Sequence, residues 1–398
     1  MNDKFRLGVF NTQPPQCYTG GVERRIKEVT HRLASQVDIT VFSGTKAGFK
    51  ALTIVNGVNI VPLCSTDRKY PLDSWTFNRS AARTFFDVDI YEAHNDSGYG
   101  LFTSLRRRGV KEPCIHTIHG VLAEEVNQAK LTGYASFQGR VVNYFMDYLA
   151  RVEKKTAMEA DLIVTISEYS FEKIQMLYDI APEKIRIVSN GVDTEKYSPK
   201  ENQAELKRGF GLREGSPVVL FVGNLIPRKG LMYLIEAAQR VVKTYLDTQF
   251  IIVGDGPLRV QLIDKLIDVN LLGNFTFMSG LTDDELAAMY GCSDVFVLPS
   301  IQEGQGIVLL EALSSGKPVV AFDIGGVNEV VINGETGLLA RNRNSEELAE
   351  ALLRLLGNFE LRQRLGLAGR RVIEDNFTWD ICARKMLKVY TEALEGRS

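Results

Sequence analysis

The sequence predicts an α/β protein built from two Rossmann-like, doubly wound domains, and three observations indicate this fold. Short apolar runs rich in β-branched residues alternate with longer segments of helical periodicity along all 398 residues. The runs are apolar throughout, as is typical of parallel strands that helices cover on both faces. They also form two sets of about six, which is more sheet than one such domain needs. We therefore expect two parallel sheets, each between layers of helices.

The first half of the chain contains the first set of expected strands. These are Phe5–Phe10, Asp38–Phe42, Asp89–His94, Cys114–His119, Asp161–Ser167 and Ile185–Asn190. Residues 137–160 form an amphipathic helix rich in aromatic side chains. We expect that helix to pack against the core, with contact to a membrane or a lipid as the alternative. Asp87-Val88-Asp89 leads into a strand, so we interpret it as a turn and not as a metal-binding pair.

The second half contains a second set of the same kind. Its strands are expected at Val218–Gly223, Phe250–Gly254, Phe275–Gly280, Val295–Ser300, Pro318–Phe322 and Gly337–Ala340. A helix begins around Ile307, and a long amphipathic helix covers residues 377–394. Asn190-Gly191 ends the last strand of the first set and marks the boundary between the sets.

These patterns predict three segments. Residues 1–192 form the first domain, residues 193–374 form the second, and residues 375–398 form a terminal helix that returns to the first domain. Ligands of open α/β sheets bind beyond the carboxyl ends of the strands. We therefore expect a central ligand cleft between the two facing domains.

The composition excludes several classes of protein. The hydrophobic fraction of 45% and the charged fraction of 24% are ordinary for a globular chain. No apolar run approaches the roughly 18 to 20 residues of a membrane span, and the N-terminus lacks a signal-peptide core. Five scattered cysteines favour a reducing compartment over zinc or disulfides, and a net charge of −2 gives no support for nucleic-acid binding. We expect a cytoplasmic protein.

Two glutamates follow the expected strand that ends near Ser300. Glu303 lies on the loop, and Glu311 lies early in the helix that begins around Ile307. Free N–H groups and the dipole at the start of that helix favour an anion. Carboxylates accept hydrogen bonds from hydroxyls, so the pair suits a ligand with hydroxyls at both ends and negative charge between them. A nucleotide sugar fits this description.

Two cations follow the first strand of the second set. Arg228 and Lys229 come shortly after Gly223, where they could bind a diphosphate and stabilise a departing nucleotide. The alternative is a solvated turn, which is the commoner role of an isolated Arg-Lys pair. Gly254 and Gly256 end the next strand and permit a tight turn, but they lack the third glycine of a dinucleotide fingerprint.

The first domain offers candidates at the ends of its own strands. Gly20 and Gly21 join the first strand region to a helix, and paired glycines let backbone N–H groups approach an anion or a sugar. His119 ends another expected strand, where ligand-binding residues of such sheets lie, although a lone histidine is more often structural. His94 is similarly placed and is the weaker candidate.

Taken together, these strings resemble the retaining GT-B glycosyltransferases of family 4, which use nucleotide sugars as hexose donors. The resemblance runs from Gly20-Gly21 through Asn190-Gly191 to Trp379, and it is most specific between Pro299 and Gly326. It implies a GT-B fold in which the first domain binds the acceptor and the second domain binds the donor.

The resemblance also assigns roles to individual residues. Glu303 matches the glutamate that contacts the donor sugar, and Glu311 matches the one that binds the ribose. Lys229 matches the lysine that grips the diphosphate, and His119 matches the histidine near the donor sugar. With Arg228, these make the expected catalytic set: Glu303, Lys229, Arg228 and His119. The remaining expected donor contacts are Glu311, Gly20, Gly21, Gly223, Asn224, Gly254, Gly280, Leu281, Gly304, Gln305, Gly306 and Ile307.

The sequence departs from the family pattern at two of these positions. Asn224 occupies the place of an arginine, so Arg228 takes over its phosphate contact or the contact is missing. Gln305 lies between the two glycines, at a position that is commonly aromatic. Neither change removes the carboxylate pair.

The implied function is transfer of a hexose with retention of configuration, without a metal ion or another cofactor. In the family's same-face mechanism the leaving phosphate helps to deprotonate the acceptor, and Glu303 positions the donor instead of attacking it. A UDP-sugar is the first expected donor and GDP-mannose the second. The expected acceptor is a glycan, a lipid-linked saccharide or a small molecule, with peripheral contact to the inner membrane face as an option. Two alternatives remain open: an epimerase or phosphorylase of related fold, and a non-catalytic partner subunit that binds sugar nucleotides.

Overall fold

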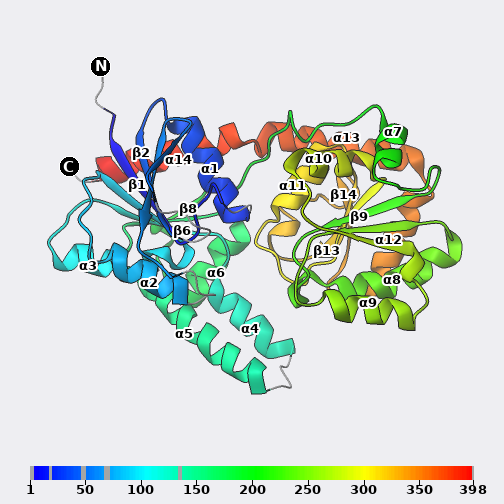
Figure 1. Cartoon of the computed structure of the whole chain (residues 1–398), viewed down its shortest axis with the longest axis horizontal. Coiled ribbons are helices and arrows are strands. Elements are labelled where there is room, and N and C mark those ends of the chain that lie inside the picture. Colours follow the sequence, from blue (N-terminus) through cyan, green and yellow to red (C-terminus); the bar gives the residue numbers. More distant parts are fainter. Residues whose placement is uncertain (1–3, 18–19, 46–50, 67–71, 133–136, 397–398) are drawn as a thin grey trace. The chain divides into compact units, whose positions relative to one another are not determined.

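The computed structural model describes residues 4–17, 20–45, 51–66, 72–132 and 137–396. The chain divides into two compact units. The first contains Met1–Asn190 and Trp379–Ser398, and the second contains Gly191–Thr378. Each unit is an α/β sheet with helices around it (Figure 1). None of the helices in the described ranges is both long enough and apolar enough to cross a membrane.

The sheet of the first unit has eight strands in the order β3-β4-β2-β1-β5-β6-β7-β8. The strands are β1 (Arg6–Asn11), β2 (Asp38–Gly44), β3 (Thr53–Val55), β4 (Val58–Leu63), β5 (Ile90–His94), β6 (Cys114–Ile118), β7 (Leu162–Thr165) and β8 (Ile185–Ile187). Every pair is parallel except β3–β4. The helices are α1 (Gly21–Leu33), α2 (Leu72–Ala81), α3 (Leu101–Arg107), α4 (Leu122–Thr132), α5 (Phe137–Glu159), α6 (Glu168–Tyr178) and α14 (Trp379–Glu395).

The hairpin of β3 and β4 is the part of this sheet that the sequence analysis missed. Asn56 and Gly57 form its turn with φ angles of 50° and 79°. Positive φ at both central residues is the mark of the hairpin turn that Asn-Gly favours. The Asn-Gly pair between two short apolar runs was therefore a usable signal. The run before it is short and largely exposed, which hid it from a search for buried strands.

The sheet of the second unit is fully parallel, with the order β11-β10-β9-β12-β13-β14. Its strands are β9 (Val218–Val222), β10 (Gln249–Val253), β11 (Phe275–Met278), β12 (Val295–Leu298), β13 (Val319–Asp323) and β14 (Gly337–Arg341). Its helices are α7 (Gln203–Gly209), α8 (Leu231–Thr244), α9 (Arg259–Asp268), α10 (Asp283–Cys292), α11 (Ile307–Ser314), α12 (Ser345–Leu356) and α13 (Phe359–Asn376). Taken in chain order, the strands lie 3-2-1-4-5-6, the order of the Rossmann fold. The connection reverses direction between β9 and β12, and ligands of such sheets bind at that switch point.

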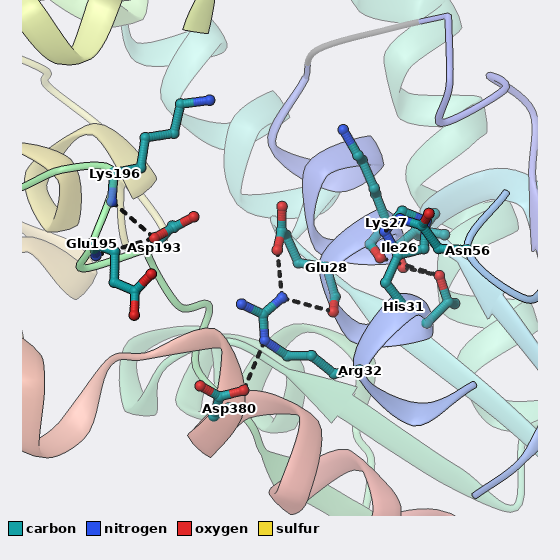
Figure 2. Close-up of polar contacts among 11 residues, drawn as sticks. Ile26, Lys27, Glu28, His31, Arg32, Asn56, Asp193, Glu195, Lys196 and Asp380 are labelled. Carbon is teal, nitrogen blue, oxygen red and sulfur yellow. Dashed lines mark hydrogen bonds and ion pairs between the residues drawn. The ribbon is translucent and has the colours of Figure 1, made fainter. Parts of the chain in front are cut away.

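The terminal helix α14 belongs to the first unit, where it packs against α1 and β5. Figure 2 shows Arg32 of α1 between Glu28 of the same helix and Asp380 of α14. Its Nε donates a hydrogen bond to Asp380 Oδ1 at 2.9 Å. Deeper in the same contact, Tyr390 and Met386 of α14 are almost fully buried.

The first and last segments of the second unit pair with each other. The N–H of Val192 donates to the carbonyl of Phe377 at 2.8 Å, and Val192 forms a bridge with Thr378. Asp193 then accepts hydrogen bonds from the N–H groups of Glu195 and Lys196, which fixes the first turn (Figure 2). Because Val192 pairs with Thr378, both segments belong to the second unit. The boundaries therefore fall before Gly191 and after Thr378 instead of after residues 192 and 374.

Candidate functional site

The candidate site of the second unit lies on the loops that follow β9 and β12, the strands on either side of the switch point. Lys229 ends a short 3₁₀ turn after β9, and Glu303 lies on the loop after β12. Lys229 Nζ contacts Glu303 Oε2 at 2.5 Å, and each side chain is 11% exposed. Arg228 Nη1 lies 3.8 Å from the same oxygen, and Ser300 Oγ donates to it at 3.4 Å. The structure thus brings three of the predicted side chains, Glu303, Lys229 and Arg228, into one cluster.

The charge of Glu303 depends on this cluster. Burial opposes ionisation of the carboxyl, but the nearby charges of Lys229 and Arg228 outweigh it and hold the pKa of Glu303 below its usual value. Glu303 is therefore a carboxylate at neutral pH. Its oxygens accept hydrogen bonds, and its negative charge is balanced by two cations.

Backbone contacts hold the two loops together. The N–H of Ile301 donates to the carbonyl of Arg228 at 2.8 Å. Gly230 has a φ of 66°, and a Cβ on it would lie 1.8 Å from the carbonyl oxygen of Pro299. Only glycine permits this approach. The spacing of Lys229 from Glu303 is thus fixed by main chain as well as by charge.

The glycine turn before α11 is held in the same way. Gly306 precedes the helix with a φ of 83°. Gly304 packs closely on Gly326, and a Cβ on Gly326 would lie 1.8 Å from the carbonyl oxygen of Gly304. The N–H of Gly326 donates to the carbonyl of Glu303 at 3.1 Å. Gln305, between Gly304 and Gly306, is buried. Ile307 begins α11, so the predicted N–H donors do lie at a helix N-terminus.

Glu311 lies one turn into α11 and is only 1% exposed. The hydroxyl of Tyr290 donates to its Oε2 at 2.8 Å, and this contact anchors the carboxylate to α10. Nothing in the sequence indicated the contribution of Tyr290. The predicted contact of Glu311 with a ribose stays a prediction.

The remaining predicted donor contacts lie at the ends of β9, β10 and β11. A Cβ on Gly254 would lie 2.0 Å from the carbonyl oxygen of Gly223, so the close approach of these two strand ends requires glycine at position 254. Asn224 is exposed beside them. Gly280 has a φ of 73°, and Leu281 packs partly against the core. These residues shape the same edge of the sheet as Glu303.

In the first unit, His119 lies just beyond β6 and contacts His94, which ends β5. His94 Nδ1 and His119 Nε2 are 2.9 Å apart. The N–H of His119 also donates to Asn95 Oδ1 at 3.0 Å, while His116 Nε2 lies 2.6 Å from the carbonyl oxygen of Asn95. The structure therefore makes His94 a direct partner of His119, although the sequence alone made it the weaker candidate.

A buried carboxylate orients this histidine pair. Glu92 Oε1 lies 3.4 Å from His94 Nε2 and accepts a hydrogen bond from Thr117 at 2.6 Å. Its other oxygen accepts a hydrogen bond from Tyr390 of α14 at 2.5 Å. A carboxylate only accepts hydrogen bonds, so the contact with Glu92 favours the His94 tautomer with its proton on Nε2. In that tautomer His94 Nδ1 accepts from His119 Nε2. With His94 in that tautomer, a neutral His119 carries its proton on Nε2, and its Nδ1 is an acceptor.

Burial keeps all three of these histidines neutral. It lowers the pKa of His94 and that of His116 to about 4, and it lowers the pKa of His119 well below its usual value. The neighbouring histidines and Arg25 act in the same direction on His119. His119 is therefore a neutral hydrogen-bonding group at physiological pH and not a cation.

The glycine loop before α1 carries an additional carboxylate. Gly20 precedes α1, which begins at Gly21, and a Cβ on Gly20 would lie 2.3 Å from Glu23 Oε2. Asn11 Nδ2 donates to the other oxygen of Glu23 at 3.1 Å. Thr19 lies outside the described residues. The sequence predicted an anion or a sugar at this loop. The negative charge of Glu23 disfavours the anion and is compatible with sugar hydroxyls.

Within the described ranges, no group of three or more His, Cys, Asp or Glu side chains is arranged to hold a metal ion. The Asp87 and Asp89 carboxylates both contact Arg6.

Solved structures superpose on nearly the whole chain. The sucrose-phosphate synthase of Thermosynechococcus elongatus superposes with a TM-score of 0.82 at 21% identity, covering 99% of this chain and 100% of that one. Anabaena HepE in complex with UDP and glucose gives a TM-score of 0.77 at 18% identity, covering 98% and 100%. The chain therefore has the GT-B fold, as predicted.

Sequence comparison identifies the family. Residues 19–196 match the family described as Glycosyltransferase Family 4, and residues 202–372 match Glycosyl transferases group 1. A GDP-mannose-dependent alpha-(1-6)-phosphatidylinositol monomannoside mannosyltransferase of Mycobacterium tuberculosis is 31% identical over 70% of this chain and 77% of its own. An uncharacterized glycosyltransferase of Methanocaldococcus jannaschii is 26% identical. The match covers 61% of this chain and 63% of the length of that relative. This chain belongs to the family 4 glycosyltransferases.

Proposed function

We propose that this glycosyltransferase moves a hexose from a nucleoside diphosphate sugar to a hydroxyl-bearing acceptor with retention of configuration and without a metal ion. The observation that carries the proposal is the Lys229–Glu303 pair on the two loops at the switch point of the second unit. It combines a hydroxyl acceptor and a phosphate-binding cation 2.5 Å apart.

In this proposal, the donor's diphosphate binds Lys229 and Arg228, and its sugar hydroxyls donate to Glu303. Breaking the bond between the anomeric carbon and the phosphate oxygen leaves negative charge on the diphosphate, which the two cations and the N–H groups before α11 stabilise. One such preorganised donor contributes on the order of 3 kcal/mol to transition-state stabilisation in other enzymes. The acceptor oxygen bonds to the anomeric carbon on the same face, and its proton passes to the leaving phosphate oxygen.

The ion pair is the reason to assign Glu303 a positioning role. A carboxylate whose pKa is held down by two cations is a weak nucleophile, and its Oε2 already accepts from both Lys229 and Ser300. It is suited to orient hydroxyls and not to form a covalent sugar adduct. A neutral His119 with a free acceptor nitrogen suits a hydroxyl of the sugar or the acceptor.

We favour a UDP-sugar as the donor and GDP-mannose as the second choice. The structure of HepE contains UDP and glucose, which supports the first. The mycobacterial relative uses GDP-mannose, which supports the second. The acceptor is a glycan, a lipid-linked saccharide or a small molecule; the mycobacterial relative acts on a phosphatidylinositol monomannoside.

The test is turnover of sugar nucleotides by point variants. Glu303→Gln and Lys229→Ala should each lower kcat for transfer or donor hydrolysis by about 100-fold or more, because each removes one transition-state contact. Glu335→Gln and Lys243→Ala change exposed residues of the same unit and should leave kcat unchanged. Normal turnover in Glu303→Gln and Lys229→Ala would remove the assignment. Dependence on inorganic phosphate would favour a phosphorylase, and tight nucleotide binding without turnover would favour a non-catalytic subunit.

A further inference from the structure

The first unit contains an open cavity of about 500 Å³ between α2, the 3₁₀ turn η2 (Asn95–Gly98) and α5. The elements around it are labelled in Figure 1, except for η2, which follows β5. Its volume is in the range of pockets that hold small molecules. Most of the described lining is aromatic or aliphatic, and the main aromatic contributors are Trp75, Tyr99, Phe145 and Tyr148.

These aromatic side chains are not part of the core. Trp75 is 53% exposed, Tyr148 is 49% exposed and Phe145 is 38% exposed. The Phe145 and Tyr148 rings are 6.2 Å apart, and the hydroxyls of Tyr148 and Tyr99 are 3.5 Å apart across the cavity lining. Packing against the core therefore explains only part of the aromatic face of α5. The rest faces a space that an apolar group could fill, and burying these rings would stabilise the complex.

One wall of the cavity is polar. The Ser74 hydroxyl donates to the carboxylate of Asp96, and Asn78 Nδ2 donates to the carbonyl of Asp96 at 2.8 Å. Asn78 Oδ1 is buried and has no hydrogen-bond partner within the described residues. An unsatisfied buried acceptor is costly, and a hydroxyl that reached it would satisfy it. Among the described lining residues, Asp96 is charged, and its carboxylate favours hydroxyl groups over an anion beside it.

Consecutive residues of η2 connect the cavity lining to the histidine site. Asn95 Oδ1 accepts a hydrogen bond from the N–H of His119, and Asp96, the next residue, lines the cavity. A molecule with hydroxyls near His119 and an apolar group attached to them could occupy both places at once.

We propose that this cavity binds the apolar portion of the acceptor, so that the acceptor is an amphiphile with a neutral, hydroxyl-bearing head and an alkyl or aromatic group. The inference rests on the proposed function and narrows its acceptor class. In this proposal the aromatic face of α5 lines a pocket for one molecule and does not lie on a bilayer.

Trp75 provides a direct reporter, because the chain has two tryptophans and Trp379 is buried on α14. We would titrate the full chain with n-octyl β-D-glucopyranoside below its critical micelle concentration and follow indole emission. The expected result is a saturable blue shift that is absent with methyl β-D-glucopyranoside, which lacks only the chain. The shift should disappear in Trp75→Phe.

Matched variants test the location. Phe145→Asp should weaken the apparent affinity for the octyl glucoside at least tenfold. Phe85→Asp changes a phenylalanine of the same unit that is 78% exposed and does not line the cavity, and it should bind normally. Equal binding by both variants, or a shift that survives in Trp75→Phe, would overturn the proposal.

Further arms separate the remaining possibilities. A response to phosphatidylcholine vesicles without any response to monomeric octyl glucoside would overturn the pocket in favour of membrane contact. Sugar transfer to other acceptors without octyl glucoside binding would likewise reject the pocket and leave the proposed function intact. Saturable binding in a protein that transfers no sugar would support the pocket and reject the function.

Discussion

Lys229 and Arg228 together keep Glu303 in its charged form. The carboxyl lies in a setting where burial alone would raise its pKa, and Lys229 and Arg228 reverse that shift. Their contribution to stability is present above the ordinary carboxyl pKa of about 4.3 and is lost as pH falls through the lower folded value. The pair was visible in the sequence as two separate motifs. Their contact was not, because it depends on how the loops after β9 and β12 are held together.

Lys229→Ala should therefore destabilise the second unit. It leaves Glu303 mostly buried with only Arg228 nearby, and breaking a buried ion pair costs about 3–5 kcal/mol at pH 7. The pKa of Glu303 then rises, so its carboxyl becomes protonated on acidification. The difference in free energy of unfolding between wild type and Lys229→Ala, which we call the gap, therefore narrows below pH 5. Urea unfolding at pH 7 and at pH 4.5 measures the gap. Lys229→Ala/Glu303→Gln should recover much of the loss, whereas an unchanged gap in the double variant would contradict the account.

The histidines predict a second pH effect. Burial lowers the pKa values of His94 and His116 to about 4. Near pH 6.5 these two histidines therefore bind protons in the unfolded chain but not in the folded chain. Stability should fall as pH drops from 6.5 toward 4, by about 1.4 kcal/mol per pH unit for each such histidine. In an NMR titration, the signals of His94, His116 and His119 should not move between pH 8 and 5.5. A signal of His119 that titrates near 6.5 would contradict a neutral imidazole.

At the scale of elements, the strands were predictable and their side-chain partners were not. All twelve expected strands appear, because apolar β-branched runs report burial directly. The β3–β4 hairpin was missed because β3 is only three residues long and largely exposed. Sequence also pointed to His119 but not to Glu92 or Tyr390, which lie 298 positions apart and meet only after α14 packs on β5.

Tyr390→Phe tests that contact between elements. It removes the hydroxyl that donates to Glu92 at 2.5 Å and leaves a buried carboxylate oxygen unpaired, at a cost of about 2 kcal/mol. Tyr390→Phe should also weaken the preference of His94 for one tautomer. The ¹⁵N chemical shifts of His94 and His119 should then move toward the values of a mixture of the two neutral tautomers. Thr391→Ala removes an exposed hydroxyl on the same helix and should change neither property. Unaltered ¹⁵N shifts in Tyr390→Phe would show that α14 does not orient the histidines.

At the scale of the whole molecule, two units carry complementary chemistry. The second has a carboxylate and two cations at the switch point of a six-stranded Rossmann sheet. The first has neutral histidines, a carboxylate beside Gly20 and an aromatic cavity. Cations suit a diphosphate, and the first unit suits uncharged hydroxyls and an apolar group. Strand alternation and motif order foretold two domains and their family, whereas the cavity depends on aromatic residues of α2 and α5 that no motif connects.

The most direct measurement compares the binding of UDP and of UDP-glucose by calorimetry in wild type, Glu303→Gln and Lys229→Ala. Lys229→Ala should weaken both ligands, because both carry the diphosphate. Glu303→Gln frees Lys229 from its ion pair, so it should bind UDP at least as tightly as wild type while losing the added affinity for the glucosyl group. If Glu303→Gln instead weakened UDP and UDP-glucose equally, or if Lys229→Ala bound both like wild type, the ion pair would not be the donor site.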